Sequence, residues 1–283
     1  MMKKIFISVI IIIVLLVAIY IILGKINKGE NIPEVVNETA DNTTILYSWD
    51  MKSIVPSVRG KLITTIKNLN IGTIYQDFST SFLQGTDNEF IKDMDSNKVT
   101  VYQLTGDPSW GADTTAKSMK REIDKIVNYN DKVEYKIKGI VMDVEVYTGD
   151  NYSGGYDYKV FQTYVDSMIE AHKYAQEKGI SFVVVIPYWL DQVGTDLLES
   201  LIRDGADEVS VMNYNIKNTV SNIEQEVAYA KKYNKGISTI YEVNFSSTNC
   251  FNNYAEIDAD YNKIFSTYNY NQLRKAYHHY GLM

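Results

Sequence analysis

From Thr44 to the end of the chain, short apolar or β-branched runs alternate with longer amphipathic segments, and this alternation restricts the fold more than any other feature. Each short run is typical of a buried strand and each longer segment of a helix, so the pattern predicts βα units around a parallel sheet. The predicted strands are Ile45 to Trp49, Ile71 to Asp77, Val99 to Leu104, Ile137 to Val146, Ile180 to Pro187, Glu208 to Tyr214, Ile237 to Val243 and a weaker Leu273 to Tyr280.

Amphipathic helices are predicted between these strands, and most end at Gly or Asn, as helix C-caps do. They include Val58 to Leu69, Ala116 to Val127, Tyr158 to Lys178, Thr195 to Asp204 and Val220 to Tyr233. Eight such units predict a (β/α)8 TIM barrel over residues 44 to 283, with its last helix apparently missing. An open doubly wound sheet is less favoured, because no Gly-rich phosphate loop follows any strand.

The N-terminal segment has a different character. Ile5 to Gly24 contains no charge and no proline, and a helix of that length spans a bilayer. The apolar run continues into lysines without a small-residue cleavage site, so residues 1 to 28 are expected to form an uncleaved membrane anchor, followed by a polar linker over residues 29 to 43. Since a large domain behind one N-terminal anchor usually translocates, we expect the barrel on the extracellular side of the cell membrane.

The formal net charge of -7 argues against nucleic acid as a partner. The chain has 3 histidines and 1 cysteine, so it contains no zinc-binding H-E-x-x-H motif and can form no internal disulfide. We therefore expect no metal and no cofactor. A divalent ion held by Asp50, Asp77 and Asp143, as in a metal-dependent deacetylase or phosphodiesterase, is the less favoured alternative, because such sites usually include histidines.

Active groups of such barrels lie at the C-terminal ends of the strands, and here those ends are polar and aromatic. All 3 tryptophans fall there. Aromatic faces stack on sugar rings while carboxylates and amides bind the hydroxyls, so this distribution favours an oligosaccharide or polysaccharide. The predicted substrate-binding residues are Tyr47, Trp49, Asp50, Asp77, Gln103, Asp107, Trp110, Tyr147, Tyr188, Trp189, Asn213, Tyr214, Asn215, Asn244 and His278.

The fourth predicted strand carries the sharpest signal, because its apolar run ends in Asp143 and Glu145. Alternation along a strand places both acids on one face, and in a shared, partly desolvated space like-charge repulsion raises one pKa. Glu242, at the end of strand seven, lies across the predicted mouth, where it is either a second catalytic carboxylate or a residue that pairs with a rim lysine such as Lys235 or binds substrate hydroxyls.

Two segments resemble the family 18 glycoside hydrolases, which include the chitinases. Gly139 to Glu145 (GIVMDVE) resembles their fourth-strand motif D-G-x-D-x-D-x-E, and Met212 to Asn215 (MNYN) resembles their M-x-Y-D. The resemblance implies Glu145 as general acid, Asp143 as the group that orients an acetamido nucleophile, and Tyr214 as support for the intermediate. Val141, Asn215 and a lysine before Gly139 stand where the family has aspartates.

A wider resemblance, to bacterial glycosyl hydrolase-like barrel proteins, covers most of residues 45 to 280 and is carried by Leu104 to Trp110 and Asp143 to Glu145. It implies the same fold. The sequence therefore predicts a glycoside hydrolase with Glu145 as general acid and Asp143 or Glu242 as its partner. A carbohydrate-binding protein on a degenerate hydrolase barrel remains the alternative, because of the departures at Val141 and Asn215.

Overall fold

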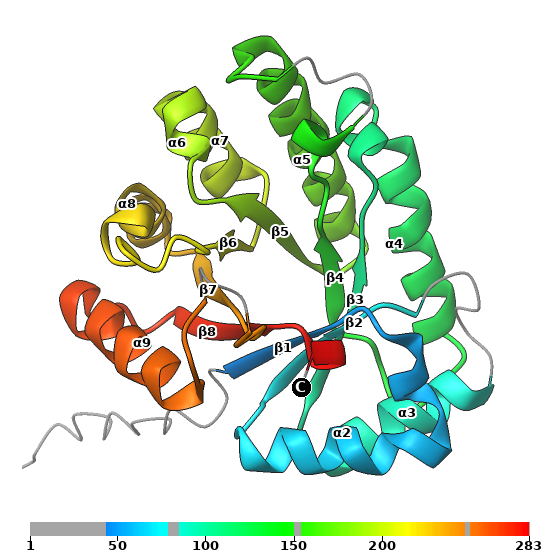
Figure 1. Cartoon of the computed structure of the whole chain (residues 1–283). Helices are drawn as coiled ribbons and strands as arrows, with labels where there is room; N and C mark the ends of the chain where they lie inside the picture. The colour runs from blue at the N-terminus through cyan, green and yellow to red at the C-terminus, as the bar shows by residue number, and fades with distance from the viewer. Residues whose placement is uncertain (1–43, 79–84, 150–153, 247–249, 283) are drawn as a thin grey trace, which may run out of the picture. The chain divides into compact units, whose positions relative to one another are not determined.

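The computed structural model describes residues 44–78, 85–149, 154–246 and 250–282. Eight strands form a closed barrel in which each strand pairs with the next and β8 pairs with β1, all parallel (Figure 1). The strands are β1 (Thr44–Ser48), β2 (Thr73–Gln76), β3 (Thr100–Thr105), β4 (Gly139–Met142), β5 (Ser181–Pro187), β6 (Glu208–Met212), β7 (Gly236–Glu242) and β8 (Leu273–His278). The predicted barrel is confirmed.

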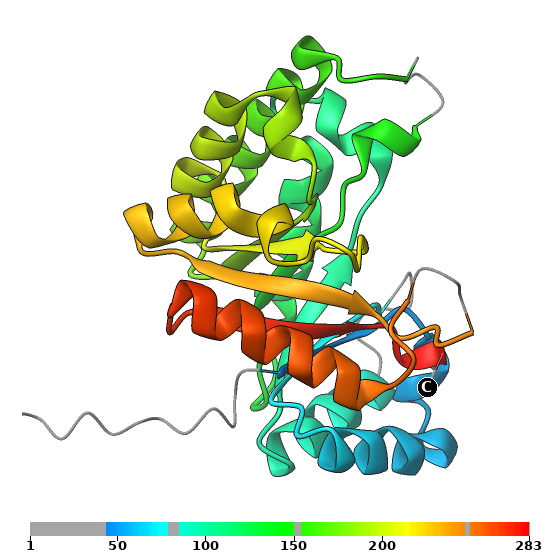
Figure 2. The ribbon, with the colours of Figure 1, turned by 60° about the vertical axis from the view of Figure 1, so that its left-hand side comes forward.

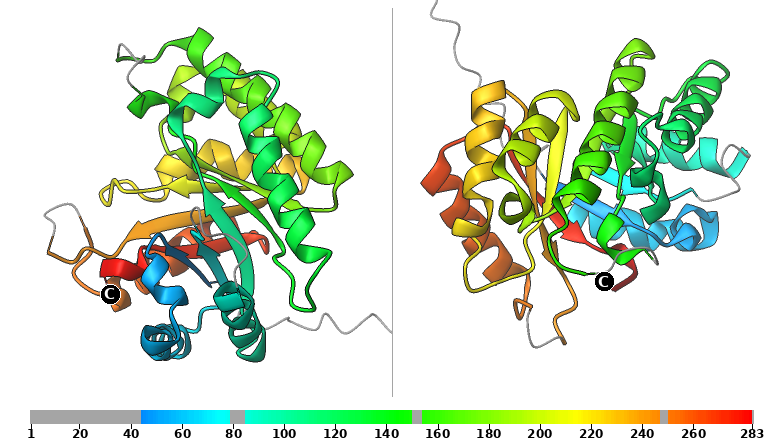
Figure 3. Two further views of the ribbon diagram at one scale, coloured as in Figure 1. Left: turned by 90° about the vertical axis from the view of Figure 1, so that its right-hand side faces the viewer. Right: turned by 90° about the horizontal axis from the view of Figure 1, so that it is seen from above.

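Helices cover the outside of the strands, as two further views show (Figure 3). They are α2 (Pro56–Asn68), α3 (Gly85–Ser96), α4 (Lys117–Asn130), α5 (Tyr158–Glu177), α6 (Leu190–Val193), α7 (Thr195–Asp204), α8 (Glu224–Tyr233) and α9 (Tyr254–Tyr268). Short 3-10 turns follow several strands: η2 (Met51–Ile54), η4 (Pro108–Ala112), η5 (Val146–Thr148), η6 (Ser221–Ile223) and η7 (Tyr280–Leu282). Up to Leu282, η7 is the only helical element after β8, so no α-helix follows that strand in the described chain.

The predicted anchor and linker, residues 1 to 28 and 29 to 43, lie outside the described residues. Within the described ranges, no helix is both long enough and apolar enough to cross a membrane.

Alternating side chains divide the apolar core into two layers. The inner layer fills the barrel and consists of Ile45, Tyr47, Tyr75, Leu104, Val141, Val183, Val185, Ile240 and Ala276. The outer layer packs between the strands and the helices and contains the neighbouring residues, such as Leu46, Ile140 and Val184. Residue parity along each strand therefore decides whether a side chain points into the barrel or toward the helices.

Polar side chains also fill the barrel interior below its C-terminal end. Arg274 of β8 pairs with Glu208 of β6 and donates a second bond to the Tyr75 hydroxyl (3.1 Å). One layer higher, the Tyr47 hydroxyl donates to Ser210 Oγ (2.7 Å). Because buried polar groups are costly unless hydrogen-bonded, these bonds allow a polar interior at little cost in stability.

The outer helices are fixed by caps and by polar contacts to the strands. Asp157 caps α5 by accepting bonds from the backbone amides of its first turn. The last helix, α9, lies along β7 and β8 (Figure 2), where Asp260 accepts a bond from Tyr241 of β7 (2.9 Å) and Asp258 accepts one from Tyr277 of β8 (3.1 Å).

Strand β4 is shorter than predicted, since it ends at Met142 rather than at Val146. The chain leaves the sheet there and Glu145 adopts φ -89° and ψ 74°, ahead of the turn η5. The alternation nevertheless continues, because Val144 and Val146 both pack into the outer core. Asp143 and Glu145 thus lie on the opposite, inner side.

One buried acid lies outside the barrel interior and gives a test of the packing. Glu226 of α8 is 1% exposed, and its Oε1 has no hydrogen-bond partner among the described residues. Burial, with a contribution from Asp191, raises the pKa of Glu226 to about 8. The folded state therefore binds a proton that the unfolded chain releases, and this contribution to stability, full at acidic pH, is lost as the pH rises toward 8.

We predict that Glu226→Gln stabilises the fold at pH 9 by about 5 kcal/mol, since the pKa rises from 4.5 to about 8 and each unit of pKa shift corresponds to ~1.4 kcal/mol. The difference should shrink toward pH 5, where the wild-type carboxyl is protonated. Thermal unfolding at both pH values measures it. The matched control is Glu224→Gln, which changes an exposed acid in the same helical turn. An equal effect of the two substitutions at pH 9 would contradict the prediction.

Candidate active site at the mouth of the barrel

The C-terminal ends of the strands, here called the mouth, bring together the three carboxylates predicted to be catalytic. The Tyr214 hydroxyl, just after β6, interacts electrostatically with Asp143, Glu145 and Glu242, and these interactions, after burial, raise its pKa. Its ring centroid lies 6.1 Å from that of His278 on β8. Residues from β4, β6, β7 and β8 therefore share one site.

Asp143 is held against the barrel wall and largely enclosed. Its backbone amide donates to Thr105 of β3 (2.9 Å), which holds it against the barrel wall. Its Oδ1 is buried and has no hydrogen-bond partner in the part of the chain that the structure describes. Burial, and then the nearby Glu145, raise the pKa of Asp143 to about 7, while His278 opposes the rise. Near neutral pH this carboxyl is therefore a proton carrier.

Gly106 makes the position of Asp143 possible. A Cβ atom on Gly106 would lie 1.8 Å from the carbonyl oxygen of Asp143, far inside contact distance. Only glycine lets the end of β3 approach the end of β4 this closely. This residue was not among the predicted site residues, and the signal that could have found it was its place at the end of the third strand.

Glu145 is held by the turn that follows it. The Tyr147 hydroxyl donates to Glu145 Oε2 (2.6 Å), and the Thr148 hydroxyl donates to the backbone oxygen of Glu145 (2.8 Å). The ring of Tyr147 packs edge to face against Trp189, with 5.0 Å between centroids. Glu145 is thereby oriented from the β5 side of the mouth by an aromatic side chain.

Glu242 is paired with histidine rather than with lysine. Glu242 and His278 are direct neighbours in the register of β7 and β8, and His278 Nδ1 lies 3.2 Å from Glu242 Oε2. Burial alone would raise the pKa of Glu242, but the bond and charge of His278, with a bond from the amide of Asn244 (3.1 Å), lower it. Lys235 instead donates to a backbone oxygen at Ala206. Glu242 is therefore kept ionised at neutral pH.

The predicted substrate-binding residues fall into two groups, because alternate positions along a strand face either the barrel interior or the helices. Trp49 and Tyr214 pack against the inner layer at the mouth, and His278 lies between the rings of Tyr47 and Tyr214. Tyr47 is 1% exposed and bonded to Ser210, so it forms the floor of the site.

Gln103 and Asn213 lie on the other face of the sheet and are not brought to the mouth. Both are buried, because their neighbours along the strand occupy the inward positions. Gln103 donates to the backbone oxygen of Leu104 (3.1 Å), and Asn213 donates to that of Thr219 (2.8 Å). Their polar groups therefore bond to the backbone of the strand and of the loop after β6, not to the mouth.

Other predicted residues also make local structural contacts. Asp50, Asp107, Asn215 and Asn244 accept hydrogen bonds within their own turns from Lys52, Ser109, Lys217 and Ser246. Trp110, Tyr188, Trp189 and Tyr147 pack against the outer core rather than the inner layer. Asp77 lies directly after β2 and is half-buried.

The arrangement of acids does not favour metal binding through Asp50, Asp77 and Asp143. Among the residues that the structure places, no three His, Cys, Asp or Glu side chains converge as a metal site requires.

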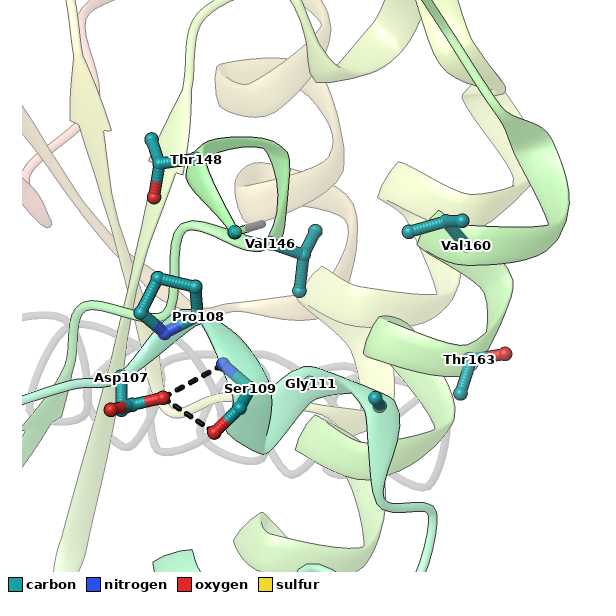
Figure 4. A pocket seen from close by; sticks show the side chains of 10 residues that line it. Asp107, Pro108, Ser109, Gly111, Val146, Thr148, Val160 and Thr163 are labelled. Atoms are coloured by element: carbon teal, nitrogen blue, oxygen red, sulfur yellow. Dashed lines mark hydrogen bonds between the residues drawn. The ribbon is translucent and has the colours of Figure 1, made fainter. Parts of the chain in front are cut away.

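A pocket of about 490 Å³ lies beside the mouth, between η4, η5 and α5 (Figure 4). Pro108, Val146 and Val160 form apolar walls, and Asp107 and Thr148 are polar lining residues. The amide and the hydroxyl of Ser109 donate to Asp107 Oδ1, and these bonds shape one edge. Neither Asp143 nor Glu242 lines this pocket, so it is separate from the carboxylates.

No family model matches the sequence, and no curated protein matches it. Solved structures share its fold. The spore cortex-lytic enzyme SleL from Bacillus megaterium QM B1551 is 11% identical with a TM-score of 0.58, covering 86% of this chain and 71% of that one. D-psicose 3-epimerase from Clostridium cellulolyticum H10 is 16% identical with a TM-score of 0.53, covering 83% and 84%. A family 18 chitinase from Pseudoalteromonas aurantia is 16% identical with a TM-score of 0.49, covering 83% and 93%. These likenesses show the fold alone.

We predict that Gly106→Ala displaces Asp143 and destabilises the fold by about 1–3 kcal/mol, because the added methyl group overlaps backbone atoms. Gly60→Ala is the matched control. Gly60 lies within α2 with nothing within 4 Å of an added Cβ, so that substitution should stabilise by about 0.5–1 kcal/mol. Chemical denaturation of both variants measures these opposite changes in the free energy of unfolding. A Gly106→Ala variant as stable as the wild type would refute the close approach of β3 and β4.

Proposed function

We propose that the barrel is a glycoside hydrolase that acts on cell-envelope or extracellular polysaccharide. The observation that carries the proposal is the acid pair after β4: an enclosed Asp143 whose pKa is raised to about 7, and Glu145 two residues closer to the mouth. Glycosidic bond cleavage needs a carboxylic acid that still holds a proton near neutral pH, together with an ionised carboxylate. The pair after β4 supplies the proton and Glu242 the charge.

In the proposed reaction, the proton held by Asp143 passes to Glu145, whose orientation is fixed by Tyr147, and from Glu145 to the glycosidic oxygen. The bond between the anomeric carbon and that oxygen breaks, and the leaving sugar departs with a hydroxyl group. Positive charge at the anomeric carbon is balanced by ionised Glu242. A water molecule then adds to that carbon and returns its proton to the acid pair, so the net reaction is hydrolysis without a cofactor.

The alternative, a carbohydrate-binding protein on a degenerate barrel, is less well supported. Carboxylates neutralised by lysine or arginine at the rim would favour it. Among the ion pairs of the described residues, Asp143 and Glu145 take part in none, and Glu242 pairs with His278. The acids are therefore arranged to exchange protons rather than to neutralise fixed cations.

The names of two similar structures fit a carbohydrate ligand, although their low identity shows only the fold. One is a spore cortex-lytic enzyme, and the other is a sugar epimerase whose structure was determined with D-tagatose. The proposed substrate therefore depends on the mouth itself, where Trp49 and Tyr214 offer aromatic surface beside the acids. With residues 1 to 28 as an anchor, we place the barrel outside the cell membrane, close to newly exported polymer.

We predict that Glu145→Gln lowers reducing-sugar release by 100-fold or more, on the order of what loss of a general acid costs. The assay uses the full-length protein in mild detergent with β-linked N-acetylglucosamine polymer, β-linked glucose polymer and peptidoglycan. Glu134→Gln, an exposed acid remote from the mouth, is the matched control and should retain full activity. Absence of release from every polymer, with binding retained to one, would instead establish the carbohydrate-binding protein.

A further inference from the structure

Two large aromatic side chains are unusually exposed just outside the mouth. Tyr156 and Tyr158, at the start of α5, are 54% and 44% exposed, although exposed aromatic surface is costly in water. Both lie against the segment that contains α6 and the start of α7. The Tyr156 hydroxyl donates to Gln192 Oε1 (3.2 Å), and the Tyr158 hydroxyl donates to Asp196 Oδ2 (2.5 Å). These bonds fix the rings by their edges and leave ring surface open to solvent.

The exposed ring of Tyr156 is continuous with the candidate active site. Tyr156 lies beside Trp189, with 5.2 Å between centroids and 32° between the planes. Trp189 rests edge to face on Phe161 and on Tyr147, at 5.8 Å and 5.0 Å between centroids. Tyr147 in turn donates to Glu145. An aromatic path thus runs from the exposed rim to the proposed general acid.

The chemistry of this path fits a pyranose ring. A rigid aromatic face binds the C–H surface of a sugar with little loss of conformational entropy, while neighbouring amide and carboxylate groups bind its hydroxyls. Gln192 and Asp196 supply such groups at the edge. The nearby ionisable side chains are Asp157, Asp191 and Lys159, which with Asp196 make three acids to one lysine, so the surface favours an uncharged sugar unit over an anionic one.

We propose that Tyr156, Tyr158 and Trp189 form an outer subsite that binds an uncharged pyranose unit of the polymer whose cleaved bond lies at Glu145. This inference rests on the proposed function. It adds that the substrate is a chain long enough to occupy both the mouth and the outer subsite. Short oligosaccharides, which fill the mouth alone, do not use the subsite.

The test compares a Tyr156→Ala, Tyr158→Ala double variant with Phe265→Ala, an exposed aromatic residue on α9 that is 37% exposed and remote from the path. Each is made in the full-length Glu145→Gln protein, so that binding is measured without turnover. The probes are insoluble chitin, cellulose and peptidoglycan, with the bound fraction measured against polymer concentration.

We expect the double variant to bind the preferred polymer about 10-fold more weakly, as loss of two stacking contacts predicts. Phe265→Ala should bind normally, and a Tyr156→Phe, Tyr158→Phe variant should retain most of the affinity because it keeps both rings. In the Glu145-containing enzyme, the double alanine variant should lose more activity toward the polymer than toward a disaccharide substrate.

Unchanged polymer binding by the double alanine variant, in a protein whose Glu145→Gln form is inactive, would overturn the subsite and leave the proposed hydrolase intact. Equal losses in the alanine and phenylalanine variants would also overturn it, because ring stacking would then not be the cause. Failure of the unmodified protein to bind or cleave any of the polymers would overturn both proposals.

Discussion

Closure of the eight parallel strands into one hydrogen-bonded circuit fixes the direction of the side chains that the strands carry. In an open sheet an end strand could slip in register, but here each strand is paired on both sides. A shift of one residue in β7 would turn Glu242 away from His278 and bring a core residue into the mouth. The site therefore depends on the barrel register more than on any single contact.

The same closure creates the electrostatic environment of the acids. Three carboxylates at one mouth repel one another, and the structure resolves this repulsion differently for each. Asp143 is enclosed and retains its proton to about pH 7, whereas Glu242 is kept ionised by His278 and the amide of Asn244. Glu145, two residues beyond Asp143 at the same strand end, is oriented by Tyr147. Acid-assisted bond cleavage requires one carboxyl group that keeps its proton and one carboxylate that stays ionised.

Much of the fold could be predicted from periodicity, because alternating runs and amphipathic segments report which surface each element buries. Helix α7 has the predicted limits of Thr195 and Asp204, and every predicted strand is found within a few residues. The pairing of Asp143 with Glu145 followed from the same periodicity. Polarity alone predicts Gln103 and Asn213 at the mouth. Their positions in the alternation along β3 and after β6 turn both side chains toward the helices instead.

Other features depend on contacts between distant segments and could not be read from local pattern. The pairing of Glu242 with His278 needs the register of β7 on β8, and the requirement for Gly106 needs the approach of β3 to β4. The exposure of Tyr156 depends on how α5 begins beside Gln192. Sequence periodicity reports the surface that a residue covers, but it does not report which residue lies opposite.

The most direct test of the central claim is the titration of the Asp143 carboxyl, followed by 13C NMR in full-length protein labelled at its aspartate carboxyl carbons and assigned by Asp143→Asn. The account predicts that this signal titrates near pH 7. A titration near pH ~4, the ordinary value for aspartate, would show that Asp143 is ionised at neutral pH and would contradict the proposed chemistry.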